Sequence, residues 1–164
     1  MKAYSKRSNN LQGTVTCPGD KSISQRSVII GSLLDEDIQI SGFLFAEDPL
    51  STIGALRNLG HEIEIDDDTV SVKNSRKKIS DQKVSCNLGN SGTGFRLISG
   101  LIAGQKIDAE LVGDDSLSKR PMNRIINPLN EMGAKIESNK GCAPLTFNKS
   151  QLVKEFLYEM PIAS

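Results

Sequence analysis

The chain has 164 residues, a length that suits one domain or a piece of a longer protein. Lys and Arg together number 20, as do Asp and Glu, so the formal net charge is zero, which argues against the basic surface of a nucleic-acid-binding protein. The three cysteines show no CxxC spacing and the N-terminal residues lack an apolar stretch, which argues against a zinc site, a disulfide framework and a signal peptide, and favours a cytoplasmic protein with no membrane partner.

The chain is expected to begin with a strand, a helix and a second strand. Residues 11–17 alternate loosely between polar and apolar side chains and predict the first strand. Apolar residues then recur at helical spacing over positions 23–34, and either Ser22 or Ser24 is suited to cap this helix. Residues 37–41 predict the second, short strand.

A second helix has clear signals at both ends. Asp48 is suited to the N-cap, Pro49 to the first helical position and Gly60 to the position after the last turn. Residues 61–65 and 69–73 alternate in polarity and predict two strands joined by an acidic turn.

The second half of the chain predicts the same succession of elements. We expect a strand at 83–86, a helix at 91–103, a strand at 106–112, a helix at 121–132 kinked at Pro128, and strands at 134–137 and 144–147. The halves match in spacing, because Pro49 lies 72 residues before Pro121 and Gly60 lies 73 residues before Gly133. The order β-α-β-α-β-β therefore occurs twice, which indicates a duplicated unit, and residues 152–164 begin a third.

Two loops join glycine residues to the start of a helix, a combination that provides free backbone donors for an anion. The first loop, residues 18–22, carries Lys21 and Ser22, and Arg26 follows one turn later. Ammonium and guanidinium groups match the oxygens of phosphate or carboxylate. The alternative is a capped helix with solvated charges.

The second loop, residues 89–94, has glycines spaced G-x-x-G-x-G, which differs from the dinucleotide-binding pattern. Asn90, Ser91 and Thr93 supply side-chain hydrogen-bonding groups, and Arg96 lies where the loop passes into the helix. A strand-to-helix turn with flexible glycines is the alternative.

Residues 114–121 hold two acids and two bases before a predicted helix. Paired carboxylates suit metal binding or acid–base chemistry, but a solvated loop is the commoner outcome. Pro121 is expected to start the helix and to place Arg120 at its positive end, where a bound anion would offset the unfavourable charge. His61, the single histidine, is expected to be structural or exposed, and the cysteines are expected to be packing residues.

Three segments resemble motifs of the 5-enolpyruvylshikimate-3-phosphate synthase family. Residues 18–26 resemble its P-G-D-K-S-x-S-x-R segment, residues 88–97 are similar to L-G-N-[SA]-G-T-x-x-R-L, and residues 113–122 resemble G-D-x-S-L-x-x-R-P-M. The resemblance covers essentially all of this chain, whereas the chain covers well under half of the family's usual length.

The resemblance implies an α/β fold of repeated β-α-β-α-β-β units, the enolpyruvyl transferase fold or inside-out α/β barrel. Two complete units are then expected at about 15–73 and 83–148, with the start of a third at about 152, all within an incomplete domain at 15–164. Residues 1–14 would form a strand that belongs to a second domain.

The resemblance also implies a reaction of the shikimate pathway, which leads to chorismate and the aromatic amino acids. The family transfers the enolpyruvyl group of phosphoenolpyruvate to the 5-hydroxyl of shikimate 3-phosphate and releases phosphate, with no metal or organic cofactor. The full-length enzyme is expected to be monomeric. This chain alone is expected to be inactive, because the family's acid–base carboxylates lie in a C-terminal part that it does not include.

Site residues carry over by motif as two overlapping sets. Shikimate 3-phosphate is expected to bind Lys21, Ser22, Arg26 and Ser164, and phosphoenolpyruvate is expected to bind Lys21, Asn90, Gly92, Thr93 and Arg120. Lys21 and Arg120 would stabilise negative charge in the transition state. Two other functions stay open: an enolpyruvyl transferase of the same fold with a UDP-sugar acceptor, and a non-catalytic anion-binding module.

Overall fold

The computed structural model describes residues 2–74, 83–150, 155 and 157–159. The elements in chain order are α1 (Lys21–Gly31), β1 (Ile38–Ser41), α2 (Glu47–Asn58), β2 (Ile63–Asp66), β3 (Thr69–Val72), β4 (Val84–Asn87), α3 (Gly92–Gln105), β5 (Ala109–Val112), the 3-10 helix η1 (Leu117–Lys119), α4 (Asn123–Glu131), β6 (Lys135–Asn139) and β7 (Cys142–Asn148). All the strands that were predicted after the first helix are therefore present.

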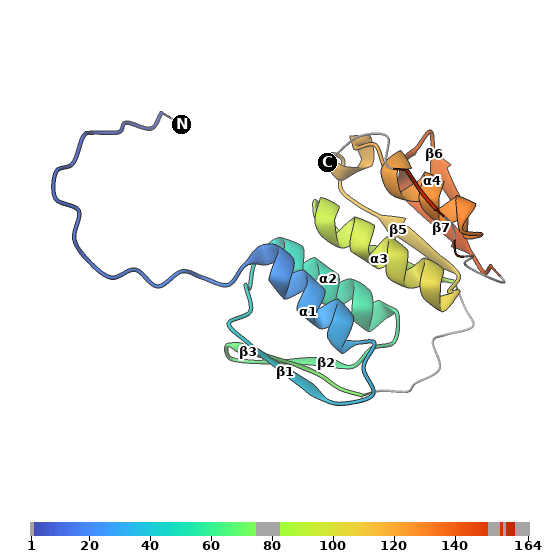
Figure 1. Cartoon of the computed structure of the whole chain (residues 1–164), viewed down its shortest axis with the longest axis horizontal. Helices are drawn as coiled ribbons and strands as arrows, with labels where there is room; N and C mark the ends of the chain where they lie inside the picture. Colours follow the sequence, from blue (N-terminus) through green and yellow to red (C-terminus); the bar gives the residue numbers. More distant parts are fainter. Residues whose placement is uncertain (1, 75–82, 151–154, 156, 160–164) are drawn as a thin grey trace.

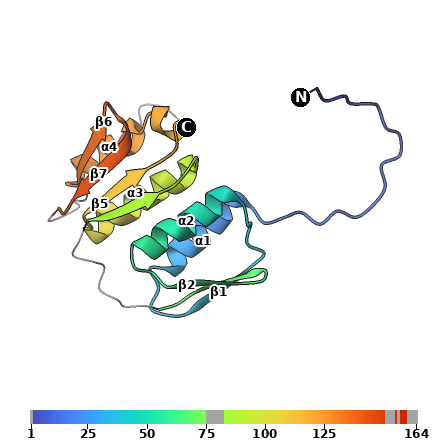
Figure 2. The same cartoon turned by 180° about the vertical axis from the view of Figure 1, so that it is seen from behind.

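The strands form two sheets that share one topology (Figures 1 and 2). In the first sheet the order is β1-β3-β2, and both pairings are antiparallel. The second sheet has the order β4-β5-β7-β6, in which β5, β7 and β6 repeat this antiparallel arrangement and β4 adds a parallel neighbour to β5. The predicted repetition of an α/β unit is confirmed, and the second unit contains all six of its elements from β4 to β7.

The strand predicted at residues 11–17 is wrong. Within the described part of the chain this segment pairs with no strand, and it runs away from the folded region in both views (Figures 1 and 2). Leu11 and Val15 are 86% and 84% exposed. Alternating side chains form a stable strand only where a neighbouring strand takes up the backbone hydrogen bonds. The assignment of residues 1–14 to a second domain stays a prediction.

Helices α1, α2 and α3 lie side by side and run in the same direction, so their N-termini face the same side of the molecule (Figures 1 and 2). The contacts among them are mostly aliphatic. Val28 of α1, Leu56 of α2 and Ile98 and Ile102 of α3 are fully buried, together with the aromatic ring of Phe95. Burial of each such side chain contributes about 1.5–3 kcal/mol to folding, so this core fixes the loops at the start of the helices.

The first helix has a different cap from the one predicted. Asp20 caps α1, and neither Ser22 nor Ser24 does, because the carboxylate of Asp20 accepts a hydrogen bond of 2.7 Å from the backbone N–H of Ile23. An aspartate at this position also interacts favourably with the positive end of the helix.

Two other helices begin away from the predicted residue. Helix α2 begins one residue before Asp48, which therefore lies in its first turn and is not its N-cap. Helix α4 begins at Asn123 and not at Pro121. The N–H of Met122 donates to the carbonyl of Gly141 at 2.7 Å, and this bond to the hairpin of β6 and β7 fixes Met122 as the cap.

The ends of the helices agree better with the sequence. Gly60 and Gly133 follow α2 and α4 with φ values of +98° and +105°, so both predicted glycine stops are confirmed. Helix α1 ends earlier than predicted, at Gly31. Helix α3 passes Gly104 by one residue and ends where Lys106 takes a left-handed conformation, with φ of +59°.

The described helices are all too short or too polar to cross a lipid bilayer, and the longest, α3, has 14 residues. The third unit that is expected from about residue 152 lies mostly outside the described residues, and Ser164 lies outside them as well.

Candidate anion-binding site

The first loop is fixed to the neighbouring segment between β1 and α2. Gly19 packs against backbone there, since a Cβ atom built on it would lie 2.1 Å from the carbonyl oxygen of Gly42. The Nζ atom of Lys21 lies 2.9 Å from Oδ2 of Asp48, and about half of the lysine side chain is exposed. Lys21 is thus held at the start of α1 by an ion pair, with its ammonium still open to a ligand.

Ser22 and Arg26 lie one helical turn apart on α1, which places them on the same face of the helix. Ser22 is half-buried and Arg26 is exposed. Because the carboxylate of Asp20 already meets the positive end of α1, an anion at the first loop would depend mainly on the side chains of Lys21, Ser22 and Arg26.

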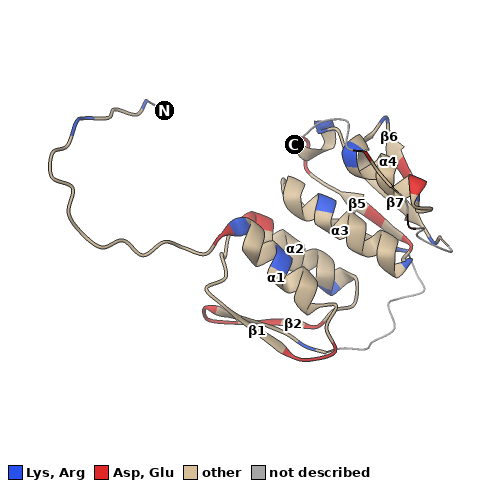
Figure 3. Ribbon diagram, viewed as in Figure 1, with Lys and Arg blue, Asp and Glu red and all other residues tan. Residues whose placement is uncertain are grey.

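The start of α3 differs in this respect. Its N-cap is the neutral Ser91, whose Oγ accepts from the N–H of Gly94 at 3.2 Å, and neutral residues make up its first turn. Helix α2, by contrast, begins with Glu47 and Asp48. Figure 3 shows this difference as red at the start of α2 and tan at the start of α3. Of the three aligned helices, α3 is therefore the one whose positive end no acidic side chain in its cap or first turn neutralises.

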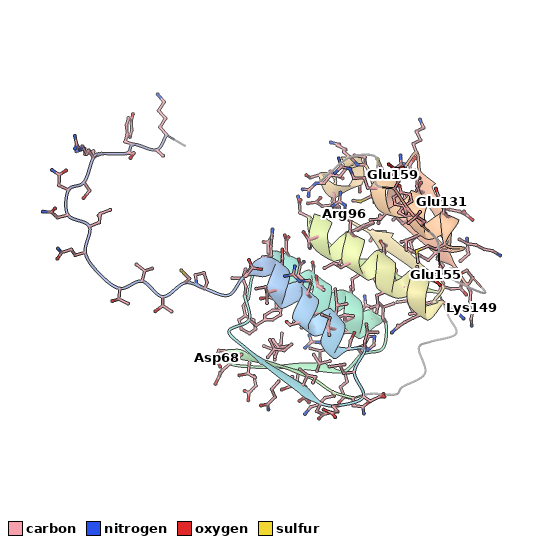
Figure 4. All side chains as sticks on the ribbon, viewed as in Figure 1. Asp68, Arg96, Glu131, Lys149, Glu155 and Glu159 are labelled. Atoms are coloured by element: carbon pink, nitrogen blue, oxygen red, sulfur yellow. The ribbon has the colours of Figure 1, made fainter. Side chains whose placement is uncertain are left out.

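Two guanidinium groups converge at this helix start. The Nη1 atom of Arg96 donates to the carbonyl of Gly92 at 2.9 Å, and a Cβ atom built on Gly92 would lie 3.0 Å from Nη1 of both Arg96 and Arg120. We call Arg96 and Arg120 the arginine pair. Figure 4 shows Arg96 on α3, in the half of the helix that leads from the second loop.

The arginine pair sets like charges side by side. Burial lowers the pKa of Arg96, and the charges of Arg120 and Arg124 lower it further. Each effect disfavours the charged form of the guanidinium. An anion bound between the two arginines would remove part of this unfavourable interaction, so the arrangement suits a phosphate or carboxylate group.

Arg120 reaches this site by a different route from the one predicted. It is not at a helix start, because it ends η1 in an extended conformation with φ of −82° and ψ of 134°. A residue before proline is pushed out of the helical region, which explains this conformation. The Nη2 atom of Arg120 donates to Oδ1 of Asn90 and, at 3.4 Å, to Oγ of Ser116.

Asp114 braces the segment that carries Arg120. Its Oδ1 atom accepts from the N–H of Leu117 at 2.7 Å, and its Oδ2 atom accepts from Nδ2 of Asn90 at 2.8 Å. The hydrogen bond from Leu117 is the main reason that the pKa of Asp114 is lowered. Asp114, Asp115 and Ser116 are exposed, as expected of a solvated loop, but Leu117 is fully buried and the Asp114 carboxylate is bound to the second loop.

The structure thus gathers some of the predicted residues and leaves others apart. Asn90, Gly92 and Arg120 lie together, while Lys21, Ser22 and Arg26 follow one another on α1 and Thr93 is exposed at the start of α3. Arg96 was not among the predicted ligands. Its spacing from Gly92, four residues along a helix, is a signal that could have identified it.

The remaining reactive side chains lie outside this site. His61 is half-buried, burial lowers its pKa, and its Nε2 atom has no hydrogen-bond partner in the described ranges. Burial raises the pKa of the Cys86 thiol to about 11, and this cysteine packs in the core as predicted. Among the described residues no three side chains of His, Cys, Asp or Glu are grouped as metal ligands.

The fold and the site define a class of protein. It is an α/β protein built from repeated units, in which a glycine-containing loop precedes the first helix of each unit and the helices α1, α2 and α3 are aligned. The units match the enolpyruvyl transferase fold that the sequence motifs predicted.

Comparison with known proteins identifies the family. The family model of EPSP synthase (3-phosphoshikimate 1-carboxyvinyltransferase) matches residues 5–164. A 3-phosphoshikimate 1-carboxyvinyltransferase of Ruthia magnifica subsp. Calyptogena magnifica is 49% identical over 97% of this chain and 37% of its own length. The corresponding protein of Thermoanaerobacter sp. (strain X514) is 46% identical over 97% of this chain and 38% of its own length. The chain belongs to the EPSP synthase family.

A solved structure supports the fold directly. EPSP synthase from Acinetobacter baumannii superposes with a TM-score of 0.82 at 40% sequence identity, over 93% of this chain and 35% of that chain. The fold class predicted from the motifs is confirmed. This chain spans little more than a third of the length of the relatives it matches.

Proposed function

We propose that the protein transfers the enolpyruvyl group of phosphoenolpyruvate to the 5-hydroxyl of shikimate 3-phosphate, with release of phosphate. Within that reaction this chain would supply loops that hold the two anionic substrates. Family membership supports the reaction. The observation that carries the role of this chain is the arginine pair, which converges over Gly92 at a helix start whose cap and first turn are neutral.

Two groups of residues divide the work. Phosphoenolpyruvate would lie at the second loop against Arg120, Asn90, Gly92 and Thr93, with Arg96 as a further cation. Charge-assisted hydrogen bonds from a guanidinium are roughly twice as strong as neutral ones, so this loop favours a carboxylate or phosphate. The neutral cap of α3 leaves its positive end available to the same anion.

Shikimate 3-phosphate would lie at the first loop against Lys21, Ser22 and Arg26, with Ser164 as a fourth contact. Lys21 would face both substrates, because its side chain is half-exposed at the start of α1, where Asp48 holds it. Fixed cations on both sides of the reacting groups would stabilise the negative charge of the tetrahedral intermediate and of the transition state that leads to it.

Calorimetric titration of the 164-residue chain tests this assignment. We expect Arg120→Gln to weaken phosphoenolpyruvate binding about 10- to 100-fold, the equivalent of one charge-assisted hydrogen bond, and to leave shikimate 3-phosphate binding nearly unchanged. Arg26→Gln should show the reverse. Lys135→Gln on the exposed face of β6 removes a charge away from both loops and serves as the control. Equal losses for both ligands in Arg120→Gln would contradict the division.

The substrate class is tested separately. Shikimate 3-phosphate and phosphoenolpyruvate should each tighten the binding of the other, whereas a UDP-sugar should compete with neither. Displacement of both ligands by inorganic phosphate with equal ease would instead favour a non-catalytic anion-binding module. We expect no turnover at ordinary enzyme rates from the 164-residue chain in a coupled phosphate-release assay, and measurable turnover would overturn that expectation.

Further proposals concern the setting of the protein. The three free cysteines, one of them exposed, support a reducing compartment such as the cytoplasm. A neutral overall charge supports small anions and not nucleic acid as ligands. A monomer that needs no metal or organic cofactor is the simplest assembly for this role, and light scattering together with activity after chelation would test it.

A further inference from the structure

A buried glutamine connects the two units next to the second loop. Gln25 of α1 is fully buried, and its Nε2 atom lies 2.7 Å from Oγ of Ser91 and 3.0 Å from Oγ1 of Thr52. Its third contact is the backbone carbonyl of Asp48, at 3.2 Å. Ser91 and Thr52 are fully buried too. We call Gln25, Thr52 and Ser91 the polar node.

The polar node includes the cap of α3, Ser91. The Oγ atom of Ser91 that accepts from Gln25 also accepts from the N–H of Gly94, at 3.2 Å. Gly94 packs closely over the node, since a Cβ atom built on it would lie 2.6 Å from Oγ1 of Thr52 and 2.9 Å from Nε2 of Gln25. Movement of the Gln25 amide would therefore displace the second loop.

The same amide is connected to the first loop. Gln25 follows Lys21 by one turn of α1, and its Nε2 atom bonds to the backbone of Asp48, whose carboxylate pairs with Lys21 at 2.9 Å. Contacts therefore run from the Lys21 ammonium through Asp48 and Gln25 to Ser91. The node joins the loop of one unit to the loop of the other.

The hydrogen bonds of the polar node are directional, so they fix the position of the second loop relative to the first more closely than apolar contacts would. A buried amide or hydroxyl that loses its hydrogen bond costs about 1–3 kcal/mol, so the hydrogen bonds of the Gln25 Nε2 atom favour one relative position of the helices, whereas the Oε1 atom has no partner among the described residues. An apolar contact of the same size would tolerate small shifts, because it has no preferred direction. A shift of the loop would displace Gly92, the residue over which the arginine pair converges.

We infer that Gln25 is a positioning residue that sets the second loop against the first and so determines the affinity for phosphoenolpyruvate without touching it. The inference rests on the proposed function for the ligand that reads out the effect. The structural link between Gln25 and the second loop does not depend on that function, because the amide exchange of Gly94 can be measured without any ligand.

The test compares Gln25→Met, Ser91→Ala and the double variant. Met keeps the length of the side chain and removes its donors, and Ser91→Ala removes the acceptor at the cap. Each single variant should weaken phosphoenolpyruvate binding about 5- to 10-fold, as expected for one buried hydrogen bond, and should change shikimate 3-phosphate binding less than about 2-fold. The double variant should bind phosphoenolpyruvate with the same affinity as the single variant that binds it less tightly, because both changes break the same contact.

Two comparisons separate positioning from general loss of stability. Ser99→Ala removes another buried hydroxyl of α3, which donates to the carbonyl of Phe95 at 2.8 Å and makes no contact with the cap residue Ser91. This variant should leave both affinities unchanged. Amide exchange of Gly94, measured by NMR without ligand, should accelerate in Gln25→Met and stay unchanged in Ser99→Ala. If Gln25→Met does not fold, Thr52→Val takes its place in both measurements, because it removes another contact of the Gln25 amide and keeps the Ser91 hydroxyl that accepts from the N–H of Gly94.

The outcomes are distinct. Additive losses in the double variant, equal losses for both ligands, or an unchanged Gly94 exchange rate would overturn the inference. If the unaltered chain binds neither substrate, the proposed function fails, and the link between affinity and Gln25 fails with it. The exchange of Gly94 would then still decide whether Gln25 positions the second loop.

Discussion

Replacement of Gly94 by alanine should destabilise the protein, although alanine favours helices. The new Cβ atom would lie 2.6 Å from Oγ1 of Thr52, 2.7 Å from Oγ of Ser91 and 2.9 Å from Nε2 of Gln25. A carbon atom makes its best non-bonded contacts at about 3.5–4.0 Å, so the atoms of the polar node must move away from the new Cβ atom. Overpacking of this kind costs about 1–3 kcal/mol.

Two smaller effects partly cancel in this variant. A weakened buried hydrogen bond costs about 1 kcal/mol. Alanine in place of glycine within a helix returns about 1 kcal/mol. The net loss should therefore be about 2 kcal/mol, which corresponds to a melting temperature lower by about 4–8 °C for a chain of this size.

Urea unfolding followed by circular dichroism measures this loss, and the same helix supplies the control. Gly100 of α3 is exposed, and a Cβ atom built on it would meet no other atom within 4 Å. Gly100→Ala should therefore stabilise the protein by up to about 1 kcal/mol. The reasoning is refuted if Gly94→Ala is as stable as Gly100→Ala, because the node would then yield at no cost.

Three further predictions follow from single features of the structure. Gly92→Ala should weaken phosphoenolpyruvate binding in calorimetry with little change in unfolding free energy, because its Cβ meets the far ends of the arginine pair at 3.0 Å and Cδ1 of Leu117 at 3.8 Å, an ordinary contact distance; unchanged affinity would contradict the proposed site. Burial lowers the pKa of His61, so the folded state favours the neutral imidazole. The contribution of His61 to the free energy of unfolding should be fully present above the unfolded pKa of about 6.5 and should be lost as the pH falls below it. Urea titrations at about pH 7.5 and about pH 5 should show this loss, and His61→Gln should remove it. With a thiol-specific chromophoric reagent, the exposed Cys17 should react at once and Cys86, buried and with a pKa of about 11, only after unfolding; equal rates would contradict this burial.

Features with a local cause could be read from the sequence. Gly60 and Gly133 end their helices because a left-handed residue is needed there, and glycine adopts that conformation without strain. The segments that alternate between polar and apolar side chains form paired strands where a turn places them next to each other. Residues 11–17 show the limit of this reasoning, since a strand also needs a partner that its own side chains do not specify.

In the candidate site, too, features with a local cause were predicted and those that depend on distant contacts were not. The glycines and the motif residues of the second loop were recognised from their order, but the position of Arg120 was not. The rule that favours proline at a helix start competed with the effect of Pro121 on the residue before it, and a contact of Met122 with a distant hairpin decided the outcome. Gln25 gave no signal at all, because its three partners come from other parts of the chain.

The unneutralised start of α3 also has a kinetic consequence. A chain with zero net charge exerts little long-range attraction on an anion, so the arginine pair and the helix end must supply whatever field guides a ligand to the second loop. That field extends over about 8 Å at physiological ionic strength. Added salt should therefore slow the arrival of a multiply charged ligand more than it hastens its departure. An anionic ligand should therefore be attracted to the second loop only from close range.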